Sequence, residues 1–342
     1  MKNGGLKRII LASFVVLAVL AGLFSAAFLK ARNSDPVYGA TFSYLYAQQF
    51  GYDWKEAYVA VLDDLGVGAL RIPIYWSEVE MSDGVYDFDH VDWMMNEAAA
   101  RSVDVTLVVG QKVPRWPECY IPDWAEYGSN NERAEQLIDF VKVSVERYEN
   151  HSALSRWQVE NESFFPFGEC PVPDPGLIER EIAIVRAFDP DHPIQLTTSG
   201  EQSFWVTRAL PADVLGVSLY RVVQDEFFGV LIFPHTAEIY AVQRVFADIF
   251  AKDVIISELQ VEPWGIGGKR IGEGYGVDAA YKLFTETDLQ YHMDFAEQTG
   301  VSEIFLWGVE WWYYLDVNGD SRLWDAGREY IQEEYEEDSQ EI

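Results

Sequence analysis

Short apolar runs alternate with amphipathic stretches along the chain after residue 35. The apolar runs are rich in β-branched residues and lack strict apolar–polar alternation, which is typical of parallel strands buried on both faces. The amphipathic stretches have the spacing of surface helices. Eight strand–helix pairs are predicted: 38–43 with 54–65, 69–74 with 90–100, 104–110 with 132–147, 156–162 with 176–187, 193–198 with 204–210, 214–220 with 239–250, 254–259 with 278–298, and 303–308 with 323–334.

This order predicts one α/β domain over residues 35–342, a (β/α)8 TIM barrel that ends in an acidic tail. No Pro- or Ser-rich linker divides it. A doubly wound open sheet is the competing fold. It usually carries a glycine-rich phosphate loop after its first strand, and the segment GATFSYLYAQQFG lacks that spacing.

Residues 9–29 form an uninterrupted run without charge. As a helix this run would be ~31 Å long, the thickness of a bilayer core. Basic residues lie on both sides, with Lys7 and Arg8 before the run and Lys30 after it. Residues 1–34 are therefore predicted to be a membrane anchor or a cleaved signal peptide, with the barrel outside the cytoplasm.

The amino-acid composition reduces the number of functions that this protein could have. The 342 residues include 25 Lys+Arg and 56 Asp+Glu, a net charge of −31, which excludes a nucleic-acid-binding surface. The five histidines show no paired ligand spacing, so neither a metal nor a cofactor is expected. Cys119 and Cys170 fall after neighbouring predicted strands and are expected to form a disulfide, which export permits.

Two glutamates occupy the predicted mouth of the barrel. Glu162 ends the fourth strand, and Glu258 ends the seventh. Barrel chemistry takes place where strands end, and strands four and seven lie across the barrel from each other. Glycoside hydrolysis needs one carboxylic acid to protonate the leaving oxygen and one carboxylate at the anomeric carbon.

Seven segments carry a family resemblance: RIPIYWSEVE, GVYDFDHVDWMM, VPRWPE, WQVENE, SLY, ISELQVEPWG and FLWGVEWW. Together they resemble clan A of the glycoside hydrolases, its cellulase-like branch, over residues 38–330. The resemblance implies a retaining enzyme with Glu162 as acid/base and Glu258 as nucleophile. It also implies that Asn161 binds the sugar 2-hydroxyl.

The resemblance assigns further residues to the substrate. Arg71 and Tyr220 would hold the nucleophile ionised and oriented, and Trp307 would form the floor beneath the sugar whose anomeric carbon reacts, the −1 sugar. Trp264 and Glu310 lie in the resembling segments and are further candidates for substrate binding. Trp116, between two prolines, is the best candidate for stacking outside that subsite.

The chain departs from the family pattern at two places. Many members carry a His after strand three or before the acid/base, and this chain has Gln111 and Lys112 after strand three. Two extra acids flank the catalytic pair. Glu160 is expected to pair with a buried base, and Glu262 is either a subsite ligand or an alternative nucleophile.

The predicted function is a retaining β-glycoside hydrolase that acts on an extracytoplasmic oligo- or polysaccharide by double displacement with two glutamates. A transglycosylase or a non-catalytic glycan-binding protein on the same barrel is the alternative. The sugar, the linkage, and exo or endo action stay open.

Overall fold

The computed structural model describes residues 36–225, 229–250, 253–264 and 281–340, and within the N-terminal segment residues 8, 11–15, 17–22 and 24–25. The predicted anchor or signal segment, residues 9–29, lies partly outside these residues. Among the helices of the described residues, none is long and apolar enough to cross a membrane.

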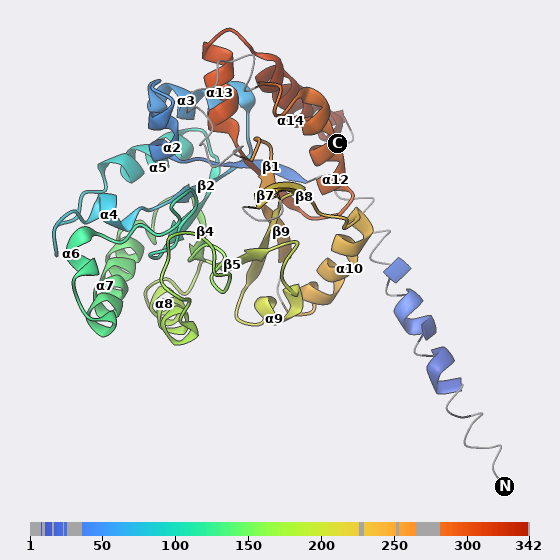
Figure 1. Cartoon of the computed structure of the whole chain (residues 1–342), viewed down its shortest axis with the longest axis horizontal. Coiled ribbons are helices and arrows are strands. Elements are labelled where there is room, and N and C mark those ends of the chain that lie inside the picture. Colours follow the sequence, from blue (N-terminus) through green and yellow to red (C-terminus); the bar gives the residue numbers. More distant parts are fainter. Residues whose placement is uncertain are drawn as a thin grey trace.

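Eight parallel strands close into a barrel, which confirms the predicted architecture (Figure 1). β1 pairs with β2 on one side and with β10 on the other, so the sheet has no free edge. The strands are β1 (Val37–Thr41), β2 (Ala69–Pro73), β3 (Asp104–Val109), β4 (Leu154–Val159), β5 (Ile194–Ser199), β6 (Val214–Leu219), β9 (Asp253–Gln260) and β10 (Glu303–Trp307).

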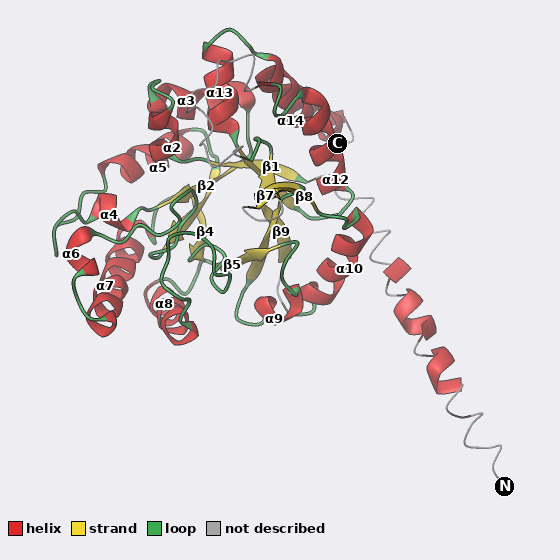
Figure 2. Cartoon of the chain, viewed as in Figure 1, coloured by secondary structure: helices red, strands yellow, loops and turns green. Residues whose placement is uncertain are grey.

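Helices surround the barrel on its outer side (Figure 2). Most of them fall close to the predicted amphipathic stretches. They are α2 (Tyr44–Gln49), α3 (Trp54–Ala60) with the π-helical turn η1 (Val61–Leu65), α4 (Trp76–Val79), α5 (Asp89–Ala100), α6 (Asp123–Glu126), α7 (Asn130–Tyr148), α8 (Pro175–Phe188), α9 (Trp205–Ala209), α10 (Ala237–Asp248), α12 (Glu286–Glu297), α13 (Val309–Val317) and α14 (Arg322–Gln340).

Local chemistry explains where these elements begin and why they are buried. Every residue of β2, β5 and β6 is buried, as expected for parallel strands covered by helices. α7 begins with a capping box in which Ser129 and Glu132 bond each other's backbone N–H groups. Asp174 caps α8, whose first residue is a proline, the residue best suited to a helix start.

Strand four is shorter than predicted. The prediction was residues 156–162, but β4 ends at Val159. Glu160 and Glu162 have φ angles of 57° and 42°, in the left-handed region, so the backbone leaves the strand before the catalytic candidates. The helix predicted at 278–298 is observed as α12, and residues 278–280 lie outside the described part of the chain.

Several elements were not predicted. The short helices α2, α4 and α6 follow β1, β2 and β3. A hairpin of β7 (Val222–Asp225) and β8 (Gly229–Ile232) follows β6, and helix α13 follows β10. α13 carries Trp311 and Trp312, whose side chains are fully buried in the core. These elements were missed because they lie in connections where a single strand–helix unit was expected.

Candidate active site

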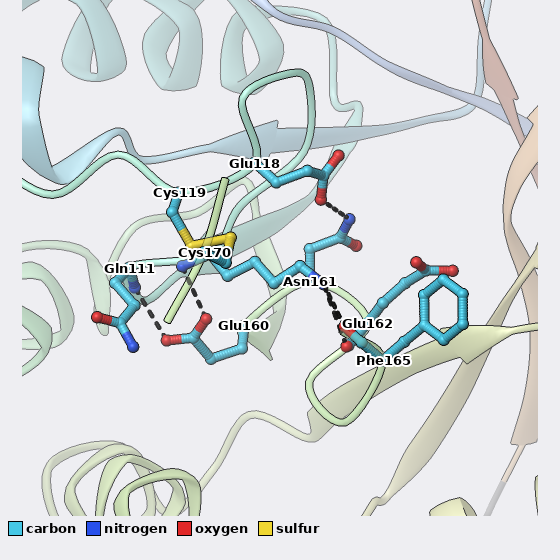
Figure 3. The surroundings of a disulfide bond; sticks show 9 residues. Gln111, Glu118, Cys119, Glu160, Asn161, Glu162, Phe165 and Cys170 are labelled. Atoms are coloured by element: carbon cyan, nitrogen blue, oxygen red, sulfur yellow. Dashed lines mark hydrogen bonds between the residues drawn. A yellow bond between two sulfur atoms is a disulfide. The ribbon is translucent and has the colours of Figure 1, made fainter. Parts of the chain in front are cut away.

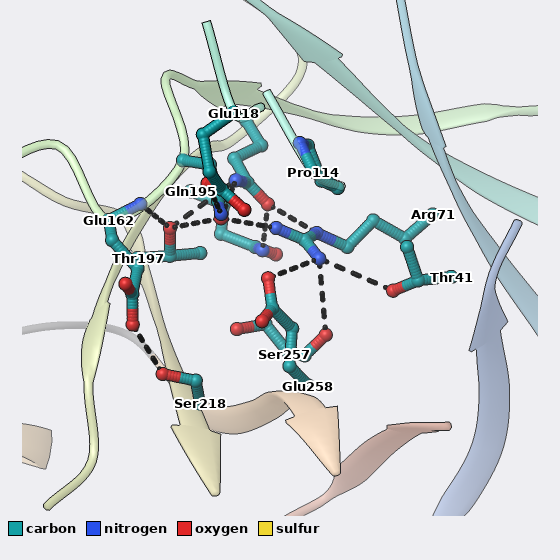
Figure 4. Close-up of polar contacts among 12 residues, drawn as sticks. Thr41, Arg71, Pro114, Glu118, Glu162, Gln195, Thr197, Ser218, Ser257 and Glu258 are labelled. Carbon is teal, nitrogen blue, oxygen red and sulfur yellow. Dashed lines mark hydrogen bonds and ion pairs between the residues drawn. The ribbon is translucent and has the colours of Figure 1, made fainter. Parts of the chain in front are cut away.

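Glu258 lies inside the carboxyl-terminal half of β9 and is held by two partners, of which Figure 4 shows Arg71. The Arg71 guanidinium on β2 donates from Nη1 to Glu258 Oε1 at 2.9 Å. The Tyr220 hydroxyl, just after β6, donates to Oε2 at 3.0 Å. Both oxygens of Glu258 therefore accept a hydrogen bond, and one of them is paired with the buried Arg71 guanidinium.

Arg71 is itself fixed inside the barrel. Its side chain is fully buried, and its Nε donates to Gln158 Oε1 at 2.7 Å. Its Nη2 donates to Asn161 Oδ1 at 2.7 Å. Arg71 thus joins Glu258 to Asn161, and it turns the Asn161 amide so that Nδ2 points away from Arg71.

Glu162 follows β4 by three residues and is buried. Its backbone N–H donates to Thr197 Oγ1 at 2.6 Å, and the Ser218 hydroxyl donates to Glu162 Oε1 at 2.5 Å. Burial, followed by the negative charge of Glu258, raises the pKa of Glu162 to about 7. The two carboxyl groups therefore occupy contrasting environments, one beside a buried arginine and the other able to keep its proton near neutrality.

Backbone strain concentrates at this mouth of the barrel. Five non-glycine residues among the described ones have positive φ, and four of them lie here: Arg115, Glu118, Glu160 and Glu162. Such conformations cost about 1–3 kcal/mol each and gather at functional sites. The strained backbone therefore indicates that Arg115 and Glu118 also belong to the site, although neither was predicted from the sequence.

Glu160 forms no ion pair with any described residue, so the expected pairing with a buried base was wrong. Its carboxylate accepts from the backbone N–H groups of Gln111 at 2.9 Å and Lys112 at 2.7 Å (Figure 3). The buried carboxyl of Glu181 on α8 is also near, because burial and then the negative charge of Glu160 raise the pKa of Glu181. Burial raises the pKa of Glu160 to about 7. Gly110 permits this packing, because a Cβ there would lie 2.7 Å from the Glu160 carboxyl.

Lys112 stands where the family resemblance leads one to expect a histidine after strand three. Its ammonium is buried and donates to the Phe165 carbonyl at 2.8 Å, and to the Glu162 carbonyl at 3.5 Å. Lys112 therefore holds the loop after β4 in place.

A second charged cluster surrounds Arg115. Its guanidinium donates to Glu262 at 2.5 Å and to Glu310 at 2.7 Å. It also lies over the Trp307 ring, 4.1 Å from its centroid. Glu262 is thus engaged by Arg115, whereas Glu258 has the arginine and tyrosine partners expected of a nucleophile. Glu310 is fully buried, and its other oxygen accepts from the Ser43 N–H at 2.8 Å.

Aromatic side chains extend from this cluster toward solvent. Trp307 is 8% exposed, and one ring face lies against Arg115. Tyr220 contacts both Trp307 and Trp264 edge-on, with centroids 6.4 and 5.4 Å away. Phe167 lies between Trp264 and Trp116, 6.3 and 6.1 Å from their ring centroids. Trp116 is 44% exposed, so its indole is open to a flat ligand.

Cys119 and Cys170 form a disulfide with a Cα–Cα distance of 5.3 Å (Figure 3). It joins the loop after β3 to the loop after β4, and these loops carry Glu118 and Glu162. Within the described part of the chain, no group of three or more His, Cys, Asp or Glu side chains is arranged to hold a metal ion.

The sequence analysis missed Arg115 and Glu118. The segment VPRWPE that contains them was used for the resemblance, but its charged residues were given no role. The sequence feature that could have identified them is the presence of two charged residues among prolines in a loop after a barrel strand. That signal does not reveal which way either side chain points.

The fold of the chain is similar to that of several known glycoside hydrolases. No protein-family model matches the chain. A GH5_18 structure from Streptomyces cattleya in complex with GlcNAc aligns with a TM-score of 0.54 at 14% identity, over 80% of this chain and 70% of that one. An exo-β-1,4-mannosidase from Opitutaceae bacterium strain TAV5 aligns with a TM-score of 0.59 at 14% identity, over 90% and 60% of the two chains.

A GH10 endoxylanase from a sugarcane soil metagenome aligns with a TM-score of 0.55 at 14% identity, over 80% of this chain and 86% of that one. In sequence, the β-galactosidase BgaB of Geobacillus sp. (strain Y412MC61) is 30% identical over 135 residues. That match covers 34% of this chain and spans a fifth, 20%, of the relative. The chain therefore has the (β/α)8 fold of the clan A glycoside hydrolases.

Proposed function

We propose that the chain is a retaining β-glycoside hydrolase with Glu258 as nucleophile and Glu162 as acid/base. The observation that carries the proposal is the contrast between the two buried carboxyl groups at the mouths of β9 and β4. Glu258 accepts from Arg71 and Tyr220, whereas the pKa of Glu162 is about 7.

In the first step Glu258 attacks the anomeric carbon while Glu162 gives its proton to the departing glycosidic oxygen. The C–O bond breaks, and a glycosyl ester forms on Glu258. In the second step Glu162 takes a proton from water, whose oxygen displaces Glu258 with net retention. This mechanism requires carboxyl groups ~5–5.5 Å apart.

The electrostatics support the change in the role of Glu162. After burial, the charge of Glu258 is the largest cause that raises the Glu162 pKa. Formation of the ester removes that charge, so the pKa of Glu162 falls and the residue becomes a base. This is the order in which a retaining enzyme needs its acid and its base.

An oligo- or polysaccharide substrate is supported by the aromatic side chains that lead outward from Trp307 to Trp116. Large aromatic planes bury the flat C–H faces of sugar rings with little loss of side-chain entropy. The names of the similar proteins include galactosidase, mannosidase and xylanase, so a panel of 4-nitrophenyl β-glycosides and β-linked polysaccharides is the first screen.

The deciding experiment follows the first product by NMR with the best substrate of that panel. We expect the β-anomer to appear first. Glu258→Ala should lose at least ~10³-fold in kcat, and azide should restore turnover by forming an α-glycosyl azide in the vacated space. An initial α-anomer, or substantial activity of Glu258→Ala without azide, would refute the assignment. Sugar acceptors in the same assay separate hydrolysis from transfer.

We also propose that the barrel works outside the cytoplasm. The apolar run at 9–29 and the Cys119–Cys170 disulfide support export, because disulfides persist in oxidising compartments. Protease digestion of intact cells that express the full chain tests this. Protection of the barrel from the protease would contradict it.

A further inference from the structure

A third carboxyl group, Glu118, reaches the centre of the candidate site from the loop after β3 (Figure 4). The residue is only 5% exposed. Asn161 Nδ2 donates to Glu118 Oε2 at 3.0 Å, and Oε1 has no hydrogen-bond partner among the described residues. The side chain is therefore buried, fixed on one side, and has one oxygen available to a ligand.

The backbone is built to hold this residue. Glu118 has a φ of 75°, lies beside the Cys119–Cys170 disulfide, and packs against Gly168. A Cβ on Gly168 would lie 2.6 Å from the Cβ of Glu118. The left-handed backbone at Glu118 costs free energy, and the close packing against Gly168 is possible only because a glycine has no Cβ. Such strain gathers at functional sites, which points to a role of Glu118 in the site.

In the described part of the chain, the positive side chains around Glu118 are bonded to other groups. Arg71 is engaged by Glu258 and Asn161, Arg115 by two other glutamates, and Lys112 by backbone carbonyls. Within the described residues Glu118 forms no ion pair. Burial, then the negative charge of Glu258, raises the pKa of Glu118 to about 8, so its carboxyl holds a proton that a cationic ligand group could replace.

Three hydrogen bonds connect Glu118 to the predicted nucleophile. They run from Glu258 Oε1 to Arg71, from Arg71 to Asn161 Oδ1, and from Asn161 Nδ2 to Glu118. If Glu258 attacks C1 of the −1 sugar, C2 carries the nearest exocyclic group of that sugar. Glu118 and Asn161 then lie beside that substituent.

We infer that Glu118 is a specificity-determining residue that binds a protonated amine at C2, so the preferred substrate is a β-glycoside of a 2-amino-2-deoxy sugar. This inference rests on the proposed function. The net charge of −31 also favours the approach of cationic glycans over anionic ones.

The test compares matched pairs of substrates at pH 6. Each pair is a 4-nitrophenyl β-glycoside with a 2-hydroxyl and its 2-amino-2-deoxy counterpart, in gluco and galacto configuration. A charge-assisted hydrogen bond predicts that the wild type favours the amine in kcat/KM by about tenfold or more. The uncharged 2-acetamido glycoside should show no such preference.

Glu118→Gln keeps the acceptor for Asn161 and removes the charge. Its preference for the amine, measured as the ratio of kcat/KM for the 2-amino glycoside to kcat/KM for the matched 2-hydroxy glycoside, should fall by about tenfold. Glu118→Asp, which keeps the charge, should retain part of the preference. Glu169→Gln is the matched control, because Glu169 is an exposed glutamate beside the same disulfide. Its preference should equal that of the wild type, and thermal unfolding checks that each variant folds.

An equal amine preference in the wild type and Glu118→Gln overturns the inference. The inference is also overturned if the enzyme turns over glycosides in the panel but none of those that carry a 2-amino group. If no glycoside in any panel is turned over, the proposed function itself fails, which separates the two results.

Discussion

Ser218→Ala should move the basic limb of the kcat/KM pH profile to higher pH. The Ser218 hydroxyl on β6 donates to Glu162 Oε1 at 2.5 Å, and both side chains are buried. This bond favours the ionised form of Glu162, whose pKa is about 7 with the bond in place. Removing the donor destabilises the carboxylate, so the pKa rises. The proposed mechanism needs protonated Glu162 in the free enzyme, so activity then persists to higher pH.

The size of the effect follows from the bond that is lost. A hydrogen bond to a charged group contributes ~1.5–3 kcal/mol. At 1.36 kcal/mol per pH unit, the pKa of Glu162 should rise by about one to two units. The basic limb should therefore move from about pH 7 to roughly pH 8–9.

The assay is kcat/KM between pH 4 and 10 with a methyl glycoside or an oligosaccharide, because a poor leaving group makes protonation necessary. Ser257→Ala is the matched control. Its hydroxyl, on β9, is buried without a hydrogen-bond partner among the described residues, so its loss should leave the limb in place. A limb in Ser218→Ala that stays near pH 7, or moves to lower pH, would refute the assignment of Glu162 as the acid.

Three further outcomes are expected. Replacing Cys119 and Cys170 by serine opens a loop of 51 residues, which should cost about 4 kcal/mol and lower Tm by roughly 6 °C in calorimetry; an unchanged Tm would contradict this. Trp116→Ala should raise KM for oligosaccharides about 2- to 13-fold but leave aryl monoglycosides unaffected in initial-rate assays, and equal effects on both would remove it as a stacking platform. Burial raises the pKa of Glu160 to about 7 in the fold, and burial also raises the pKa of its neighbour Glu181 well above the usual range of a glutamate. These acids therefore stabilise the fold at low pH and lose that effect as pH rises through 7. The free energy of unfolding in urea should fall between pH 5 and pH 8, and it should fall less in Glu181→Gln than in the wild type. An equal fall in both proteins would contradict this.

Strand and helix order, and with it the barrel, could be read from the hydrophobic pattern. Buried parallel strands need continuous apolar runs, and their covering helices need one apolar face, so both leave local signals. The same pattern pointed to Glu162 and Glu258, because residues that follow barrel strands meet at one rim whatever their distance along the chain.

Local pattern failed where the backbone or a partner is set by long-range packing. Strand four was predicted to reach Glu162, but left-handed φ angles at Glu160 and Glu162 end it at Val159. Glu160 was expected to find a base, yet backbone N–H groups of the neighbouring loop and Glu181 on α8 surround it. Residue type told us that a buried acid needs partners, but not which ones.

The sequence by itself thus determined the barrel and the pair of acids at its mouth, because both follow from periodicity and strand position. Only the tertiary structure decided which side chains surround that pair. Arg115 and Glu118 come from one short loop, yet Arg115 turns toward Glu262 and Glu310, and Glu118 turns toward Asn161. Those directions depend on strained φ angles and on contacts with loops far along the chain, and neither leaves a periodic trace in the sequence.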